Sequence, residues 1–246
     1  IDDMIENDER SKLDLFIQRW IQKKINTELK SLVNLKNIQE KNSDLRALAY
    51  RLYENNGVVK RDDVSFYLKN LDQNERKKLR NIGVKFGRYH IFLFKLFKPS
   101  SVSLRTLLWK NYNQKNDQLE PPKFGLNFLE QEKPFNKEFM LLCGFEKFDK
   151  FYVRIDILER LFLMIFNSKN NNNETEIKLK PDMLNLLGCN KENFVQLLKK
   201  MNYRMFEKEK ELYFKYIPTR RLIKKKNFKA DSRNTPFEIL KQLNLK

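Results

Sequence analysis

The chain has 246 residues, of which 41% are hydrophobic, enough for one large domain or two to three small ones. Its formal net charge of +18 favours a polyanionic partner, most simply nucleic acid. No apolar run approaches the ~20 residues that cross a bilayer, and no signal peptide opens the chain. We therefore expect no membrane partner and a cytoplasmic location. Cys143 and Cys189 fit no zinc spacing, which predicts two reduced, buried thiols.

Helical patterns dominate residues 1–115, and the chain begins at Ile1, which suggests a piece of a longer protein. Residues 11–35 predict one long amphipathic helix. Its apolar stripe consists of Leu13, Phe16, Ile17, Trp20, Ile21, Ile25, Leu29, Leu32 and Val33. Its opposite face is basic, which is typical of a solvated surface or of a nucleic-acid contact.

Three short helices are expected next, over residues 44–53 and 63–70 and from 72 to 83. Their N-terminal caps are expected at Asn42 or Ser43, at Asp62, and at Asp72, which forms a capping box with Glu75. Helices this short need a shared core, so residues 1–115 predict a bundle-like helical domain.

Residues 83–97 form a β-branched and aromatic segment, which predicts a strand or a fully buried stretch. His90 is the only histidine and is interpreted as a hydrogen-bonded structural residue rather than a base or a metal ligand. Arg88 beside it could contact a phosphate or pair with an acid. Ser101 or Ser103 is expected to cap the helix that follows.

Residues 116–134 hold three of the seven prolines and many polar side chains, which predicts a linker. A short helix over residues 136–142 is then expected to lead into a second domain, residues 135–217. A helix over 156–166 carries apolar side chains at i, i+3 and i+4, and a polar loop over 167–174 is expected to end it.

The rest of this domain predicts a strand near Ile177 and two helices, followed by a hairpin around residues 208–210. Pro181 starts the first helix and Gly188 ends it, whereas Asn190 caps the second. Helix, strand, helix, helix and hairpin is the order of a winged helix. The predicted fold class is thus mainly α with small β, a bundle-like part followed by a winged-helix-like domain.

The helix after Asn190 carries polar side chains off its apolar stripe, where a helix-turn-helix would face a nucleic-acid groove. These candidate binding residues are Lys191, Gln196, Lys199, Lys200 and, just after the helix, Arg204. Solvated surface residues are the alternative interpretation.

Residues 218–246 form a basic tail with a short helix expected near its end. The candidate phosphate contacts of this tail are Arg220, Arg221, Lys224, Lys225 and Lys226. Tyr213, Tyr216 and Phe228 lie among these charges and could stack on unpaired bases. A disordered, solubilising tail is the alternative.

Motifs for catalysis are absent: the sequence has no P-loop, GxGxxG, HExxH or GxSxG. Asp156 and Glu159 lie beside Arg154 and Arg160, which is typical of intrahelical ion pairs. No enzyme activity and no cofactor are therefore expected of this chain itself.

Several stretches together resemble a known family. They are LRALAYRLYENNGVV from Leu45, LRNIGVKFGRYHIF from Leu79, KPS from Lys98, LLW from Leu107, VRIDILERL from Val153, LLGC from Leu186, LLKKMNYR from Leu197 and DSRNTPF from Asp231. In order and spacing they resemble the C-terminal region of a bacterial superfamily-two, DExH-box helicase family, similar to the mitochondrial degradosome RNA helicase.

The resemblance implies an accessory module, because the two RecA-like domains that bind ATP and Mg²⁺ lie upstream of this region in such helicases. The partners expected are RNA or DNA and the RecA-like domains of the same polypeptide. A second hypothesis is a docking module that joins a helicase to a nuclease or to the ribosome. A third is a stand-alone winged-helix regulator that binds duplex DNA.

Overall fold

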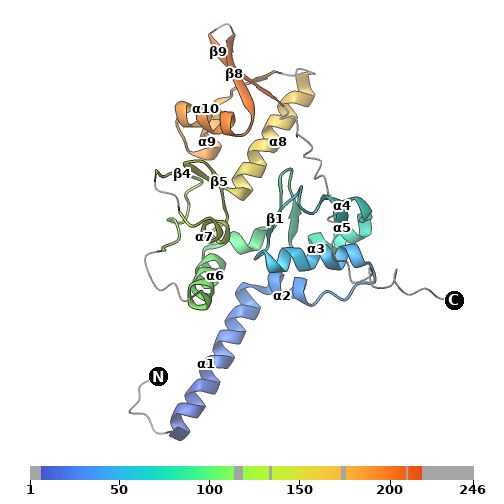
Figure 1. Ribbon diagram of the computed structural model, residues 1–246, viewed down its shortest axis with the longest axis vertical. Helices are drawn as coiled ribbons and strands as arrows, with labels where there is room; N and C mark the ends of the chain where they lie inside the picture. The colour runs from blue at the N-terminus through green and yellow to red at the C-terminus, as the bar shows by residue number, and fades with distance from the viewer. Residues whose placement is uncertain (1–6, 114–118, 133–134, 173–175, 209, 218–246) are drawn as a thin grey trace, which may run out of the picture. The chain divides into compact units, whose positions relative to one another are not determined.

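The computed structural model describes residues 7–113, 119–132, 135–172, 176–208 and 210–217. The chain divides into two compact units, Ile1–Tyr216 and Ile217–Lys246, and every element below belongs to the first. The described residues are 57% helix and 18% strand, with the strands in small three-stranded sheets (Figure 1). The predicted class, mainly α with small β, is therefore confirmed.

The described chain opens with helices that pack around one apolar core: α1 (Asn7–Glu28), α2 (Lys30–Lys36), α3 (Ser43–Glu54), α4 (Ser65–Asn70) and α5 (Gln73–Ile82). The Asn42 side chain accepts the N–H groups of Asp44 and Leu45, and Asp72 forms the predicted capping box with Glu75. Such caps define helix starts because the first N–H groups of a helix have no partner within it.

Tertiary packing overrides several predicted helix boundaries. The helix expected over residues 11–35 is interrupted at Leu29, and the break lets both Leu29 and Leu35 enter the core. Buried Val64, rather than Asp62, stands at the N-cap of α4.

The helix α6 (Pro99–Tyr112) begins at Pro99 instead of following a serine cap. Proline suits this position because its fixed φ fits the first helical turn and its missing N–H needs no partner there. Ser101 lies inside the helix and donates its hydroxyl to the backbone carbonyl of Glu28 at 3.0 Å. The predicted cap at Ser101 or Ser103 is therefore wrong.

The aromatic segment at 83–97 folds as an antiparallel hairpin, β2 (Val84–Phe86) and β3 (His90–Leu93), followed by the 3-10 helix η1 (Phe94–Phe97). β3 also pairs with β1 (Val58–Lys60), so the sheet order is β1-β3-β2. All four residues of β3 are buried, which is why the segment shows no alternation of polar and apolar residues.

A second sheet was not predicted from the sequence. It consists of β4 (Phe128–Glu130), β5 (Phe145–Phe148) and β6 (Phe151–Arg154), in the order β4-β6-β5, with α7 (Lys137–Leu142) between its first two strands. The expected linker, 116–134, therefore contains a strand. β4 has three residues and pairs with a strand more than twenty residues away, so neither periodicity nor a tight turn marks it.

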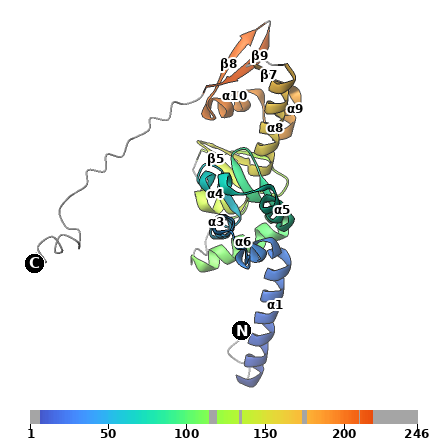
Figure 2. The ribbon, with the colours of Figure 1, turned by 90° about the vertical axis from the view of Figure 1, so that its right-hand side faces the viewer.

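The elements from residue 155 onward follow the predicted order. They are α8 (Ile155–Asn172), β7 (Ile177–Lys178), α9 (Pro181–Leu187), α10 (Lys191–Lys200), β8 (Tyr203–Lys208) and β9 (Glu211–Tyr216). The sheet order is β7-β9-β8, and both views show α9 and α10 beside α8 (Figures 1 and 2). The loop expected at 167–174 is wrong in part, because α8 continues through Asn172. Each asparagine lowers helix stability by only a few tenths of a kcal/mol, or ~0.7 at most.

The apolar core of residues 155–216 is built from α8, α9, α10 and the hairpin, with Leu158, Phe194 and Phe214 fully buried. Ile155, at the start of α8, packs instead with Val58 and Phe92 from the first sheet. This contact joins the α8–β9 segment to the helices and strands that precede it.

Candidate nucleic-acid interface

The packing of its apolar stripe determines which side of α10 faces solvent. Asn190 caps the helix through the N–H of Asn193, and Phe194, Leu197 and Leu198 are completely buried beneath it. The Phe194 ring meets Phe214 of β9 edge to face, with ring centroids 6.5 Å apart. Because this side is held by the core, the opposite side of α10 must face solvent.

The exposed side of α10 carries the predicted residues Lys191, Gln196, Lys199 and Lys200, and Arg204 follows it in β8, also exposed. Among the described residues, no hydrogen bond or ion pair occupies the side chains of Lys191, Gln196 or Lys199. Their ammonium and amide groups are therefore available to a ligand, and such groups bind phosphate oxygens and base edges.

Lys200 differs from the other four residues because it already has a partner. Its Nζ lies 2.7 Å from Oδ2 of Asp149 in the turn between β5 and β6, and hydrogen bonding to Lys200 lowers the pKa of Asp149. Both side chains are more than half exposed, so the pair is weak and an incoming phosphate can compete for the lysine.

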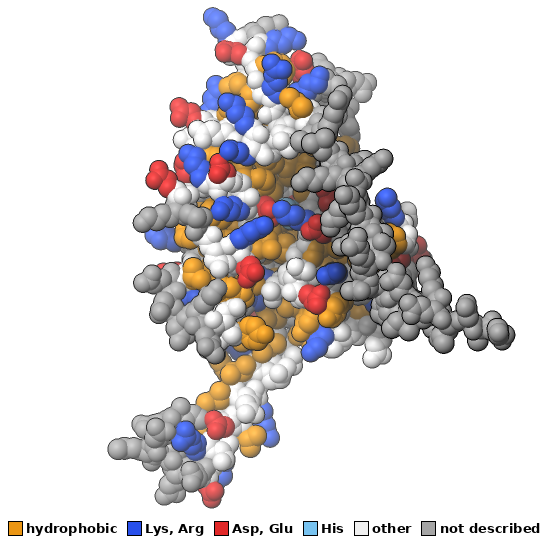
Figure 3. Space-filling model, viewed as in Figure 1, with side chains coloured by type: hydrophobic (Ala, Val, Ile, Leu, Met, Phe, Trp, Pro, Cys, Tyr) orange, Lys and Arg blue, Asp and Glu red, His pale blue; other side chains and the backbone are white. Residues whose placement is uncertain are grey.

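Further acids lie close to this side of α10. Asn193 donates to Oε2 of Glu130 at 2.8 Å, and Glu130 also pairs with Lys150. Glu192 is exposed on α10 itself. Figure 3 shows Lys and Arg side chains spread over one face of the molecule with Asp and Glu among them. Sequence reasoning missed Glu130 and Asp149 because they belong to the unpredicted sheet.

The other predicted contacts, Arg220, Arg221, Lys224, Lys225 and Lys226, lie outside the described residues, as do Phe228 and the expected C-terminal helix. Of the aromatic candidates, Tyr213 stacks on Phe206 with centroids 6.0 Å apart, and Tyr216 is 46% exposed.

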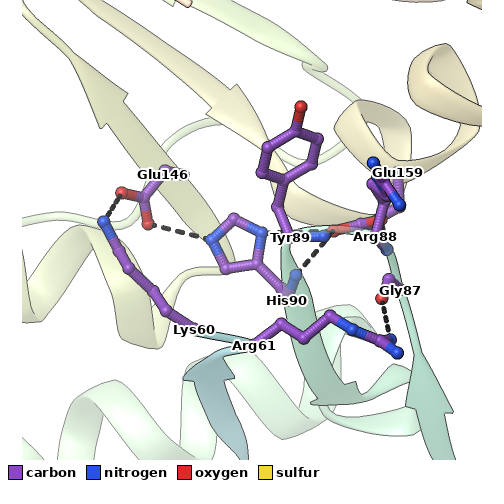
Figure 4. Close-up of polar contacts among 8 residues, drawn as sticks. All are labelled: Lys60, Arg61, Gly87, Arg88, Tyr89, His90, Glu146 and Glu159. Carbon is purple, nitrogen blue, oxygen red and sulfur yellow. Dashed lines mark hydrogen bonds and ion pairs between the residues drawn. The ribbon is translucent and has the colours of Figure 1, made fainter. Parts of the chain in front are cut away.

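A second cluster, far from α10 in sequence, is organised by Glu159 of α8 (Figure 4). Its carboxylate accepts the backbone N–H groups of Arg88, Tyr89 and His90, the last at 2.8 Å. A side chain at Gly87 would clash with this carboxylate, since a Cβ there would lie 2.4 Å from Cδ of Glu159. The expected ion pair forms between Arg154 and Asp156, at 2.7 Å, but it is not intrahelical because Arg154 is the last residue of β6. Glu159 instead binds the 87–90 turn.

His90 lies between two carboxylates and is 3% exposed. Its Nε2 is 3.3 Å from Glu146 and its Nδ1 is 3.3 Å from Glu159, while Lys60 pairs with the other oxygen of Glu146 at 2.8 Å. Burial opposes the imidazolium charge, but the hydrogen bonds that the ring donates to both glutamates outweigh it and raise the pKa of His90. His90 thus joins β3, β5 and α8, in keeping with the predicted hydrogen-bonded structural role.

Burial also disfavours the ionised forms of the two glutamates, yet the hydrogen bonds that they accept outweigh this effect and lower the pKa of each. Hydrogen bonds from His90 and Lys60 lower the pKa of Glu146, and those from His90 and the 88–90 backbone lower that of Glu159. The cluster is consequently a hydrogen-bonded network that holds the 87–90 turn against α8.

This turn brings Arg88 and Tyr89 to the base of the β8–β9 hairpin. The Tyr89 ring packs on Phe162 with centroids 4.0 Å apart, and burial, followed by the nearby Tyr216, raises the pKa of the Tyr89 hydroxyl. The Tyr203 ring is 5.3 Å from Tyr216. Arg88, Tyr89 and Tyr216, which we call the aromatic patch, are all exposed. No sequence signal pairs residues this far apart, although Arg88 and Tyr216 were each singled out.

Comparison with protein-family models, with curated proteins and with solved structures found no match to this chain. Among the described helices none is long and apolar enough to cross a membrane. Within the same residues, no group of three or more His, Cys, Asp or Glu side chains could hold a metal ion.

Proposed function

We propose that residues 155–216 form a winged helix that binds nucleic acid, RNA in preference to DNA, as an accessory module of an ATP-dependent helicase. The order of its elements and the sheet order β7-β9-β8 support the winged-helix assignment, with α10 in the place of the recognition helix. In this proposal the RecA-like domains of the same polypeptide bind ATP and Mg²⁺, and this chain contacts the strand.

The observation that carries the proposal is the solvent-facing side of α10. Lys191 and Lys199 lie two helical turns apart with Gln196 on the adjacent row, and Arg204 follows. Each lysine that neutralises a phosphate releases counterions, which gives a salt-dependent affinity. The predicted tail cluster from Arg220 to Lys226 would add to the same electrostatic contribution.

The aromatic patch supports binding to unpaired bases. Tyr89 and Tyr216 are partly exposed, and the first is held in place by Phe162 and by the Glu159 network. Aromatic side chains stack on bases of any sequence when these are single-stranded, and an arginine such as Arg88 can add a phosphate contact. This favours a single strand over a duplex as the ligand.

A second candidate function is docking to a protein, such as a nuclease or the ribosome. It is favoured by the mixed charge around α10, where Glu192, Glu130 and Asp149 lie among the lysines. A surface with both signs of charge suits a protein partner better than a uniformly basic one.

The test is a fluorescence anisotropy titration of the whole chain with labelled single-stranded RNA and with duplex DNA at several salt concentrations. We expect tighter binding to RNA and a log K that falls linearly with log salt. Changing Lys191 and Lys199 together to Glu should reduce the slope of log K against log salt by about 2, because each lysine contributes about one phosphate contact.

The matched control changes two exposed lysines of α4 and α5, Lys69→Glu with Lys77→Glu, by the same charge. If both double variants lose affinity equally, net charge rather than the α10 surface drives binding. Absence of binding at low salt would reject nucleic-acid recognition and leave protein docking as the better proposal.

A further inference from the structure

The helix α1 presents an apolar stripe that no described residue covers. Its side chains are Leu13, Phe16, Ile17, Trp20 and Ile21, which are 42%, 67%, 36%, 54% and 38% exposed. The same stripe continues into Ile25, which packs against the N-terminal core, and buried Leu29. No other described element lies beside the N-terminal half of α1 in either ribbon view (Figures 1 and 2).

The stripe is contiguous rather than a scatter of single side chains. Its members follow i, i+3, i+4, i+7 and i+8 spacing, so they form one surface along about two turns and a half of helix. A continuous exposed apolar surface of this kind marks an interaction site. Phe16 and Trp20 are its largest members, and aromatic residues are the usual anchors of protein interfaces.

We propose that this stripe binds the same stripe of a second copy of the chain, with the two α1 helices antiparallel. The charges along α1 carry the choice of partner. Residues 7–17 hold three acids and the two bases Arg10 and Lys12, a net charge of −1, whereas residues 18–28 hold three bases and Glu28, a net charge of +2. Antiparallel pairing sets the acidic end of each helix against the basic end of the other.

The register follows from the spacing. Centring the pair between Phe16 and Ile17 places Leu13 of each copy opposite Trp20 of the other, and residue 9 level with residue 24. At 100° per residue, Glu9 and Lys23 lie on the same flank of the stripe as Phe16. A twofold axis brings equal flanks together, so Glu9 meets Lys23 of the second copy. Arg10, on the other flank, already interacts within its own chain.

A membrane surface is a poorer partner for this helix. Interfacial helices have a strongly basic polar face, whereas the five bases of α1 are offset by four acids. The pairing is also short: residues 9–24 span about 24 Å at 1.5 Å per residue. Such an interface is smaller than the ~800 Å² per partner of stable complexes, so the dimer is reversible, with a Kd of about micromolar order.

Sedimentation velocity of the whole chain tests this proposal. Between about 1 and 100 µM we expect the apparent mass to rise from 29.9 kDa toward that of a dimer. Trp20→Glu should weaken the dimer at least about tenfold, because it puts a charge in the apolar interface. Leu15→Glu is the matched control, since Leu15 is 53% exposed on the opposite side of the same helix. A monomer at every concentration, or equal losses in both variants, overturns the proposal.

A charge exchange tests the orientation. Glu9→Lys and Lys23→Glu should each weaken the dimer, and the two changes combined in one chain should restore it. In a parallel pair Glu9 would instead face Glu9 of the second copy. The combined variant would then dimerise no better than the single variants, and that result would reject the antiparallel arrangement. A chain that stays monomeric but binds anionic vesicles through Trp20 would assign the stripe to a membrane and likewise overturn the proposal.

Discussion

Helices α1 and α10 have the same kind of sequence pattern and different surroundings. In α10 the apolar stripe of Phe194, Leu197 and Leu198 is completely buried, and polar side chains face solvent. In α1 the stripe around Phe16 and Trp20 is itself exposed. Periodicity therefore defines the apolar face of a helix, but only the neighbouring elements determine whether that face is core or binding surface.

The largest expected difference between the two helices is in stability. Phe194→Ala should lower the free energy of unfolding by about 3–5 kcal/mol, because it leaves a cavity beside Phe214. Phe16→Ala should change it by no more than about 0.5 kcal/mol in dilute solution, where α1 is unpaired. Urea unfolding measures both values. Similar losses in the two variants would mean that α1 is packed as tightly as α10.

Of the two regions compared, only the one that contains α8 and α10 should show a pH-dependent stability, because His90 contacts Glu146 and Glu159 there. The folded-state pKa of His90 is raised, so its stabilising contribution is complete below the unfolded value of 6.5. That contribution is lost as the pH rises through the folded pKa. The pKa values of Glu146 and Glu159 are lowered in the folded state, so the stabilising contribution of these glutamates is complete above pH 4.5. It is lost as the pH falls through their folded-state pKa values.

Hydrogen exchange across pH 5 to 9, corrected for the intrinsic rate, would detect this effect because His90 is the only histidine. We expect amides of α8 to lose protection above pH 6.5 while those of α1 residues 9–24 do not change. In His90→Gln this loss above pH 6.5 should disappear. Its persistence in the variant would show that another group titrates there.

Exposed aromatic residues offer a second matched pair. Tyr216→Ala should weaken binding to single-stranded RNA by about 1–3 kcal/mol if a base stacks on this ring. Trp20→Ala removes a similarly exposed ring from α1 and should leave RNA affinity unchanged. The anisotropy titration compares them directly, and the stacking interpretation fails if Trp20→Ala has the larger effect.

The smallest expected effect concerns Lys200. Asp149→Asn removes its partner and should raise RNA affinity slightly, by freeing one more cation beside α10. The same neutralisation on α1, Asp14→Asn, supplies the control for net charge. An equal gain in both variants would show that the increase is long-range electrostatics and not the release of Lys200.

Local sequence signals predicted much of this structure. Asn42, the Asp72–Glu75 pair and Asn190 cap helices as expected, and Gly188 ends α9 in the left-handed conformation. These features depend on a few neighbouring residues, so a single sequence reveals them. The solvent-facing residues of α10 were also predictable from the sequence, because they are the residues that lie off its apolar stripe.

The features that were missed all depend on distant residues. β4 exists because β6 supplies its partner, and the acids beside α10 come with that sheet. Glu159 had the pattern of an intrahelical ion pair, but its carboxylate binds a turn about seventy residues earlier. Sequence spacing carries no information about such contacts, which is why the aromatic patch emerged only from the structure.

Lysine footprinting tests most directly the claim that α10 is the nucleic-acid surface. The chain would be acetylated at low reagent concentration with and without single-stranded RNA, and the reactivity of each lysine read by mass spectrometry. The account predicts that RNA protects Lys191 and Lys199 while Lys23 and Lys24 of α1 react as before. Protection of the α1 lysines with Lys191 and Lys199 unchanged would contradict it.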